Sequence, residues 1–517
     1  MKNLLKNLER PPILNDCRRF RRVKVDFPVA YERGAYSEQN CAGERTDPIR
    51  GRAVNLSEGG LAIFLPSKLT IGEKSRVKLT PLEWEQAICA NSVVVWQQKH
   101  IYARFGQQGP HQSLLTGVKF VDLQPSLYRS IRAFLLMRRH MFRLTRGADG
   151  DQETLAYWIN RGTELPGDRI LKQEFLRSIQ EIWQLLELAE QYCKAFDKNK
   201  LEKAKRITFI NEMGDGIFPS LDQAFFQLWK CVEQLPKLEY KVYQRYLQDT
   251  LGPWLLAAKI NRHIYVKPFG YAGDYVVMNF LYADEYEGDS SYSKLLHRYT
   301  LHLPAARAHI NRRLYFRHKI LEATGRAKGN VIRIASIPCG PAVEIIDLLR
   351  RGELPRGTKF LGIDFESRVL KQIWENVREL DYRQRGIEIE LSHKNILEFL
   401  HDNAHFPELE NQNFIYCSGF LDYLSNRMAA RVISYLFDQL APGGELICVN
   451  ISKDNPSRAV LEMLGEWELH HRNAETLIGL TRDLGKSADV RVEFEPETKM
   501  NIFLIIKKSG GLHGWSG

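Results

Sequence analysis

The chain has 517 residues, too many for one ordinary hydrophobic core, and this length predicts about three domains. Hydrophobic residues make up 44% and charged residues 26%, which is ordinary for a soluble globular protein. The eight cysteines form no Cys-x-x-Cys pair, so we expect neither a structural metal site nor a disulfide framework.

Location and partners follow from hydropathy and charge. The first residues, Met1-Lys-Asn-Leu-Leu-Lys6, lack the apolar core of a signal peptide, and no later run is long enough for a membrane span. We therefore expect a cytoplasmic protein without a transmembrane segment. The net charge of +11 permits binding to nucleic acid or a membrane surface, but cations spread over solvated helices explain it more simply. No nucleic-acid polymer is expected as a partner.

Residues 26–120 predict a small antiparallel β-barrel. Short segments rich in β-branched and aromatic residues alternate there with turns that contain glycine, proline or serine. A closing helix is predicted over 125–145, and 146–151 has the composition of a linker. The seven predicted strands are 27–31, 51–54, 60–64, 75–79, 90–96, 101–105 and 115–120.

Two short motifs in this region suit a small phosphorylated ligand. Arg18 and Arg22 are spaced i, i+4 before the first strand, and Asn55-Leu-Ser-Glu-Gly-Gly60 begins where a predicted strand ends. Guanidinium groups bridge phosphates and stack on or fork to guanine. A solvated arginine arm and an ordinary turn are the alternatives.

Together the two motifs resemble the paired Arg-x-x-x-Arg and Asp/Asn-x-Ser-x-x-Gly motifs of PilZ domains, over about residues 15–145. The resemblance implies a regulatory ligand, cyclic di-GMP. It also implies which residues bind that ligand: Arg18, Arg19, Arg22, Asn55, Ser57 and Gly60.

Residues 152–325 are predicted to be mostly α-helical. Amphipathic stripes run over 168–199, 221–235 and 238–256. A dimerisation bundle, a lid and a spacer all fit such a region, so a homodimer is one of the open options.

A glycine- and aromatic-rich stretch, Lys267 to Tyr275, interrupts these helices. It can present Tyr271 and Asp274 to a ligand; alternatively, Asp274 caps a helix over 275–282. Arg312 follows on another predicted helix, where its guanidinium pairs either with a substrate carboxylate or with acidic neighbours.

Residues 326–508 alternate predicted strands and helices, which is typical of a doubly wound, Rossmann-like α/β sheet. The last two strands have little between them and predict an antiparallel terminal hairpin. The predicted strands are 331–337, 360–363, 387–391, 414–418, 445–449, 490–494 and 502–506.

The first of these strands leads into a tight turn around Gly340, where a ligand can approach the backbone, and then into a helix. Asp364 ends the second strand, the position at which nucleotide-binding α/β folds hold ribose hydroxyls. No G-x-G-x-x-G phosphate motif is present. A nucleoside cofactor without phosphates, such as S-adenosylmethionine, is therefore favoured over a dinucleotide.

This pattern resembles the class I S-adenosylmethionine-dependent methyltransferases, although Pro341 departs from the usual glycine. The resemblance implies a set of cofactor-binding residues: Ser336, Cys339, Gly340, Glu344, Asp364, Asn395, Ile396 and Ser418. It also places a second set near the transferred methyl group, as catalytic candidates: Tyr271, Asp274, Arg312, Asp422 and Tyr423. No metal is expected.

Residues 260–508 resemble more narrowly a bacterial family labelled as makers of 3-hydroxypalmitic acid methyl ester. Four segments carry this resemblance: Gly270–Asp274, Cys339–Glu344, Phe420–Leu424 and Trp467–Arg472. It implies methyl transfer to the carboxylate of a 3-hydroxy fatty acid, held by an arginine such as Arg312. A carboxylate needs orientation and exclusion of water rather than a base. For a hydroxyl acceptor, Asp422 or Asp274 would be the candidate base.

These resemblances together predict a cyclic di-GMP-responsive methyltransferase that acts on a small molecule. The alternative is a cyclic di-GMP receptor whose methyltransferase fold is a non-catalytic interaction module. Methylation of RNA or DNA is disfavoured, because Cys417-Ser-Gly-Phe420 stands where a base-methylating motif such as Asn-Pro-Pro-Tyr would follow the fourth strand.

Overall fold

The computed structural model describes residues 23–33, 48–79, 88–102, 111–125, 127–132, 135, 171–199, 202–327, 330–395, 398 and 406–510. The chain divides into two compact units, Met1–Thr154 and Leu155–Gly517. The helices of the predicted middle region therefore belong to the same compact unit as the C-terminal sheet. None of the helices in the described part of the chain is long and apolar enough to cross a bilayer.

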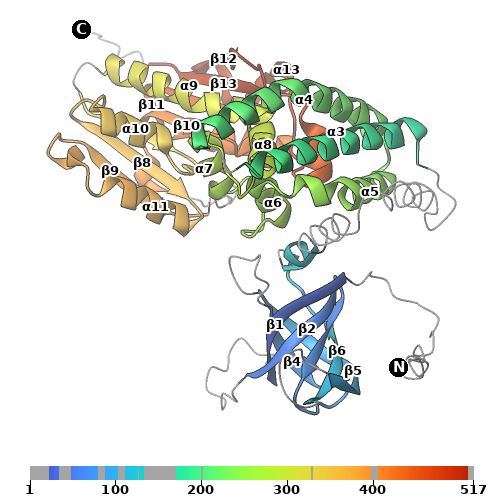
Figure 1. The fold of residues 1–517 in the computed structure, drawn as a ribbon. Helices are drawn as coiled ribbons and strands as arrows, with labels where there is room; N and C mark the ends of the chain where they lie inside the picture. Colours follow the sequence, from blue (N-terminus) through green and yellow to red (C-terminus); the bar gives the residue numbers. More distant parts are fainter. Residues whose placement is uncertain are drawn as a thin grey trace, which may run out of the picture. The chain divides into compact units, whose positions relative to one another are not determined.

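The first unit contains a closed antiparallel barrel in the strand order β1-β2-β3-β6-β5-β4 (Figure 1). Its six strands are β1 (Val23–Arg33), β2 (Ile49–Ser57), β3 (Gly60–Leu65), β4 (Lys74–Leu79), β5 (Ile88–Tyr102) and β6 (His111–Phe120). The predicted barrel is confirmed, but the count of seven strands is wrong. Residues 90–96 and 101–105 were predicted as two strands, whereas β5 runs through the polar residues between them because their backbones continue to pair with β6.

Alternation of buried and exposed residues defines the barrel core. In β4, Ser75, Val77 and Leu79 are buried and the intervening residues are exposed. Tyr31 and Ile63 are fully buried beside them. Residues 127–132 are helical, and Ile131 of this segment belongs to the same core.

The second unit is built on a seven-stranded sheet in the order β12-β13-β11-β10-β7-β8-β9. Its strands are β7 (Ile332–Ser336), β8 (Thr358–Asp364), β9 (Glu388–His393), β10 (Gln412–Cys417), β11 (Leu440–Ile451), β12 (Ala488–Phe494) and β13 (Asn501–Lys508). Strands β7 to β11 pair in parallel, and β13 is antiparallel to both β11 and β12. The predicted doubly wound sheet with a terminal hairpin is confirmed.

Helices cover both faces of this sheet. On one face lie α9 (Pro304–Arg326), α10 (Val343–Arg351) and α11 (Ser367–Val377), and on the other lie α12 (Asn426–Asp438) and α13 (Ala474–Gly479). Strand β10 shows why both faces are apolar. Phe414 and Tyr416 point into the first core, and Ile415 and Cys417 into the second.

The helices that precede α9 and the sheet in the sequence belong to the same unit, and we call them the helical cover (Figure 1). Its helices are α3 (Gln173–Asp197), α4 (Lys203–Val232), α5 (Lys237–Leu255), α6 (Lys259–Val266), α7 (Tyr275–Ala283) and α8 (Ser291–His302). Helix α4 begins well before the predicted 221 and passes through Pro219, because buried residues from Ile210 to Val232 continue its apolar stripe.

Side-chain hydrogen bonds tie the cover to the sheet unit. Gln244 Nε2 donates to the Glu462 carbonyl at 2.6 Å, and Gln248 Nε2 donates to the Met463 carbonyl at 2.9 Å. The Lys267 ammonium donates to the Gly465 carbonyl at 2.8 Å. The cover and the segment that follows β11 are therefore held in a fixed relation.

Candidate cofactor-binding and active site

A cavity of about 350 Å³ lies at the carboxyl ends of β7, β8 and β10. One wall comes from the sheet, and the other comes from the loop before α7 and from α9. The cavity gathers most of the residues singled out in the sequence: Tyr271, Arg312, Ser336, Cys339, Gly340, Glu344, Asp364, Ser418, Asp422 and Tyr423.

The turn between β7 and α10 is tied to the end of β8. The Gly340 N–H donates to Asp364 Oδ2 at 2.9 Å, and the Glu366 N–H donates to Asp364 Oδ1 at 2.9 Å. Each carboxylate oxygen keeps capacity to accept a further hydrogen bond. Burial raises the pKa of Asp364, and the backbone N–H groups oppose that shift.

The backbone of the turn explains its unusual residues. Gly340 has a φ of +48° and nothing within 4 Å of the position of a Cβ, so its backbone faces open space. Pro341 lies between β7 and α10, where its missing N–H breaks no strand or helix hydrogen bond. The departure from glycine at this position is therefore compatible with the turn.

Glu344 and Tyr416 form a buried pair in the cavity wall. The Tyr416 hydroxyl donates to Glu344 Oε1 at 2.6 Å. Glu344 lies in the first turn of α10, where the helix dipole favours a carboxylate. Burial raises the pKa of Glu344, and the hydrogen bond from Tyr416 opposes this. The Tyr416 ring packs against the ring of Phe316 of α9, with ring centroids 4.7 Å apart.

Arg312 reaches the cavity from α9 and is 5% exposed. Its Nη2 lies 3.4 Å from the sulfur of Met278 and 3.4 Å from the hydroxyl of Tyr282. Among the residues that the structure describes, Arg312 forms no ion pair, and its Nε has no hydrogen-bond partner. Gly419, after β10, passes so close that a Cβ there would lie 3.0 Å from Arg312 Nη1.

Two backbone N–H groups fix the position of Asp422. Its carboxylate accepts the Ile451 N–H at 2.7 Å, and its carbonyl accepts the His470 N–H at 2.7 Å. Burial raises the pKa of Asp422 to about 6, against the opposing charges of Arg312 and Arg472. Asp422 is therefore protonated more easily than an ordinary carboxyl group.

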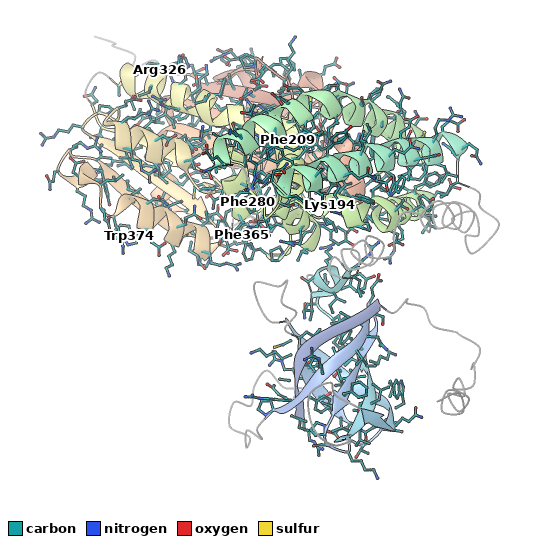
Figure 2. The ribbon with its side chains drawn as sticks, in the orientation of Figure 1. Lys194, Phe209, Phe280, Arg326, Phe365 and Trp374 are labelled. Carbon is teal, nitrogen blue, oxygen red and sulfur yellow. The ribbon has the colours of Figure 1, made fainter. Side chains whose placement is uncertain are left out.

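Tyr271 and Phe365 form the aromatic edge of the cavity, with ring centroids 5.6 Å apart. Phe365, labelled in Figure 2, follows Asp364 and is 47% exposed. Burial and the nearby Asp364 raise the pKa of Tyr271, so its hydroxyl stays protonated at neutral pH. This edge joins the loop of the helical cover to the end of β8.

The sequence did not single out His309, which also lines the cavity. Its Nδ1 lies 2.6 Å from the Ala305 carbonyl, which can only accept, so Nδ1 carries the proton and Nε2 is an acceptor. Burial and the charge of Arg312 lower the pKa of His309 to about 3. A histidine within a helical pattern carries no sequence signal that separates this position from a core residue.

Two of the predicted residues that the structure describes, Asp274 and Asn395, are not in the cavity wall. Asp274 instead caps α7 by accepting the Val276 and Val277 N–H groups, and its Oδ2 lies 2.8 Å from His263 Nε2. The alternative interpretation of Asp274 as a helix cap is the one that the structure shows. Asn395 is exposed and lies outside the cavity wall, and Ile396 lies outside the described residues.

The second predicted site is the motif in the barrel. Asn55 Oδ1 is buried and has no hydrogen-bond partner in the described part of the chain. The Ser57 hydroxyl donates to the Gly60 carbonyl at 3.0 Å, which closes the turn. A Cβ on Gly60 would lie 2.2 Å from the Val118 carbonyl, so close approach of β6 requires this glycine. Arg18, Arg19 and Arg22 lie outside the described residues.

Glu58, within the same turn, is bonded to the helical segment that follows the barrel. The Tyr128 hydroxyl donates to Glu58 Oε2 at 2.7 Å. Arg132 Nε lies 3.8 Å from Glu58 Oε1, and both side chains are buried. The motif turn and residues 127–132 are thus joined through one carboxylate.

The sheet order, with antiparallel β13 between β11 and β12, is that of the class I methyltransferase fold. The family model of the PilZ domain matches residues 16–137, so the chain carries an N-terminal PilZ domain. No curated protein matches the chain. Among the described residues, no group of three or more His, Cys, Asp or Glu side chains is arranged to hold a metal ion.

Solved structures similar to this chain include two bacterial proteins and one cyanobacterial enzyme. A possible exported protein from Bordetella parapertussis is 16% identical, with a TM-score of 0.41 over 57% of this chain and 97% of that one. An O-methyltransferase family protein from Burkholderia thailandensis is 16% identical, with a TM-score of 0.31 over 52% and 71%. Magnesium protoporphyrin IX methyltransferase from Synechocystis PCC 6803, with bound S-adenosylmethionine, is 11% identical, with a TM-score of 0.29 over 40% and 83%.

Proposed function

We propose that the protein is an S-adenosylmethionine-dependent methyltransferase for a small-molecule acceptor, and that its PilZ domain binds cyclic di-GMP and regulates it. One observation carries the first part. From β7 the chain continues to β8 on one side, while β10 returns to the other side of β7. The cavity lies at the carboxyl ends of these strands, the topological switch point at which open α/β sheets bind their ligands.

The residues at this point suit a nucleoside. Asp364 keeps acceptor capacity for ribose hydroxyls and already fixes Gly340, whose backbone faces open space. Cys339, Ser336 and Ser418 line the same wall. The assignment of Asn395 and Ile396 to the adenine stays a prediction.

The bound cofactor would supply an electrophilic methyl group on a sulfonium. The chain's own residues then have to orient the acceptor and keep water out. These two effects lower the barrier of such transfers. Tyr271 and Tyr423 supply aromatic walls for this purpose. For a hydroxyl acceptor, Asp422 is the base that we retain, because it lines the cavity and Asp274 does not.

The size of the cavity limits the acceptor. At about 350 Å³ it is close to the lower end of ligand pockets, roughly 300–1,000 Å³, and it has to hold the cofactor as well. The carboxylate of a 3-hydroxy fatty acid remains our proposed acceptor. On this volume, only the head group of such an acid enters the cavity and its chain extends outside.

Calorimetry with S-adenosylmethionine tests the proposal against the alternative of a non-catalytic interaction module. We expect binding to the full chain and a loss of at least tenfold in affinity on Asp364→Ala, since a hydrogen bond to a charged group contributes about 1.5–3 kcal/mol. Asp489→Ala, at an exposed position of β12, is the matched control and should bind normally. No heat with the unaltered chain would favour the interaction module. Mass spectrometry of lipid extracts from cells with and without the protein then searches for the methyl ester.

Regulation by cyclic di-GMP needs its own test. Two observations support binding at the motif turn: the match of the PilZ model, and Asn55 Oδ1, which has no hydrogen-bond partner among the described residues. We expect Arg22→Ala and Asn55→Ala to weaken cyclic di-GMP binding, while S-adenosylmethionine binding stays unchanged. Equal turnover and equal oligomeric mass with and without the dinucleotide would contradict a regulatory role.

A further inference from the structure

Arg312 is a buried cation of the cavity wall, and Glu344, Asp364 and Asp422 are buried acidic residues of the same wall. Arg312 of α9 is 5% exposed and Glu344 of α10 is 7% exposed, and both side chains line the cavity. Within the described residues no ion pair joins Arg312 to Glu344, nor either of them to another residue. Their charges nevertheless act on each other, since Arg312 lowers the pKa that burial raises at Glu344.

Burying these charges without an ion pair costs free energy when no ligand is bound. A guanidinium stays protonated at any ordinary pH, so Arg312 cannot become neutral to escape burial. A buried charge is tolerated when an opposite charge and hydrogen bonds compensate it. The cavity that Arg312 and Glu344 both line therefore suits a ligand that carries a carboxylate and an ammonium group together, as an α-amino acid does.

The neighbours of Arg312 place it beside the turn between β7 and α10. Phe316, one turn further along α9, packs on Tyr416, and the Tyr416 hydroxyl holds Glu344. Gly419 leaves room for the Arg312 guanidinium at the end of β10. The guanidinium thus lies on the same part of the wall as Glu344.

We propose that Arg312 and Glu344 together bind the amino acid end of the cofactor, Arg312 its carboxylate and Glu344 its ammonium group. This rests on the proposed function. It assigns Arg312 to the carboxylate of the cofactor rather than to the carboxylate of the acceptor, which has the same chemistry. Helix α9, which precedes the first strand of the sheet, then supplies a cofactor-binding residue, so the segment from β7 onward does not complete the site by itself.

Binding to the full chain, measured by calorimetry, tests this with three ligands. S-adenosylmethionine carries both groups, decarboxylated S-adenosylmethionine lacks only the carboxylate, and 5′-methylthioadenosine lacks the whole amino acid end. Arg312→Met should weaken S-adenosylmethionine by roughly 10- to 150-fold and leave the decarboxylated ligand unchanged. Glu344→Gln should weaken both ligands that carry the ammonium group and leave 5′-methylthioadenosine unchanged.

The controls separate the assignment from loss of folding. A variant that still binds 5′-methylthioadenosine has an intact nucleoside site. Arg312→Lys keeps the charge and should retain part of the preference for the carboxylate. Arg317→Met, on the same helix and paired with Glu353, should behave as the unaltered chain.

Two results would overturn the assignment while leaving the proposed function intact. In the first, Arg312→Met weakens the intact and the decarboxylated cofactor by the same factor. In the second, it leaves both affinities unchanged and raises only the KM of the acceptor, which would assign Arg312 to the acceptor's carboxylate. Failure of the unaltered chain to bind any of the three ligands would instead overturn the proposed function, and the assignment with it.

Discussion

The indole Nε1 of Trp467 donates a hydrogen bond to the Tyr423 hydroxyl at 3.0 Å. The loop of the helical cover lies against this pair, because a Cβ on Gly273 would be 2.5 Å from the Tyr423 oxygen and 2.5 Å from Trp467 Cζ2. Three segments that are far apart in the sequence therefore meet at one point of the cavity wall. Gly273 comes from the loop before α7, Tyr423 from the segment after β10, and Trp467 from the segment after β11.

Removing both partners of this pair should cost less stability than the sum of the two single removals. Tyr423→Phe leaves the indole N–H without its acceptor, which costs about 1–3 kcal/mol when the donor is out of water. We expect a lower thermal unfolding midpoint for Tyr423→Phe, and a double variant with Trp467→Phe that loses less than the sum of the two single changes. Strictly additive losses in thermal denaturation would show that the hydrogen bond contributes nothing.

Gly273 should tolerate no side chain. Gly273→Ala has to displace either the loop or the Trp467 ring, since its Cβ would meet both at 2.5 Å. We expect a fall of several degrees in the unfolding midpoint and weaker binding of S-adenosylmethionine. Gly216→Ala in α4 is the matched control, because nothing lies within 4 Å of its Cβ and alanine favours a helix by up to about 1 kcal/mol. A stable Gly273→Ala chain with unchanged binding would contradict the close contact.

His297 should make the protein less stable in acid. It is fully buried, and neither ring nitrogen has a hydrogen-bond partner among the described residues. Burial, aided by the charges of Arg298 and Lys294, lowers the pKa of His297 from 6.5 to about 4. Between these two values the unfolded chain binds a proton that the folded chain excludes, so stability falls as the pH decreases through this window.

The measurement compares thermal midpoints from pH 7 to pH 4. His297→Leu fills a similar volume without a titrating group, so its midpoint should fall less steeply over this range. His318→Leu, at a side chain that is 71% exposed, should follow the unaltered chain. Parallel curves for the unaltered chain and His297→Leu would rule out this contribution.

Arg472 should be needed for the position of Asp422 and Tyr423. Its buried guanidinium donates hydrogen bonds on both sides of these residues, to the Leu421 and Leu424 carbonyls and to the side chains of Asn426 and Asn450. Arg472→Lys cannot reach all four acceptors and leaves some of them unpaired in the interior, at a cost of about 3 kcal/mol. We expect a lower unfolding midpoint and slower turnover, whereas Arg482→Lys at an exposed position changes neither.

The sheet was predictable because each strand is short, apolar and bounded by turn residues. The predicted 360–363 and 445–449, for example, lie within β8 and β11. The ends of the strands were not predictable, because pairing with a neighbouring strand extends a strand beyond its apolar centre, as it does in β5 of the barrel. Arg18 and Arg22 fall within the range that the PilZ family model matches, but their role stays a prediction because they lie outside the described residues.

The cavity wall was only partly predictable for a different reason. Gly340 follows β7 and Asp364 ends β8, where the local sequence predicts a ligand-binding turn. His309 and Phe316 reach the cavity from the side of a helix, and only the packing of α9 on the sheet decides which of its faces meets the ligand. Asp274 illustrates the opposite case, since its local role as a cap takes up the carboxylate.

Helix α9 has a consequence for how the protein can be divided. It is continuous from Pro304 to Arg326, packs on the sheet through Phe316 and Ile320, and lines the cavity with His309 and Arg312. A fragment that starts at the predicted boundary of 326 would expose the apolar face that α9 covers and would lack the part of the cavity wall that α7, the loop before it and α9 supply. The loop before α7 also lines the cavity, and α5 is hydrogen-bonded to the segment that follows β11. A shortened version intended for binding studies therefore has to begin ahead of the helical cover, before Gln173, rather than at the first strand of the sheet.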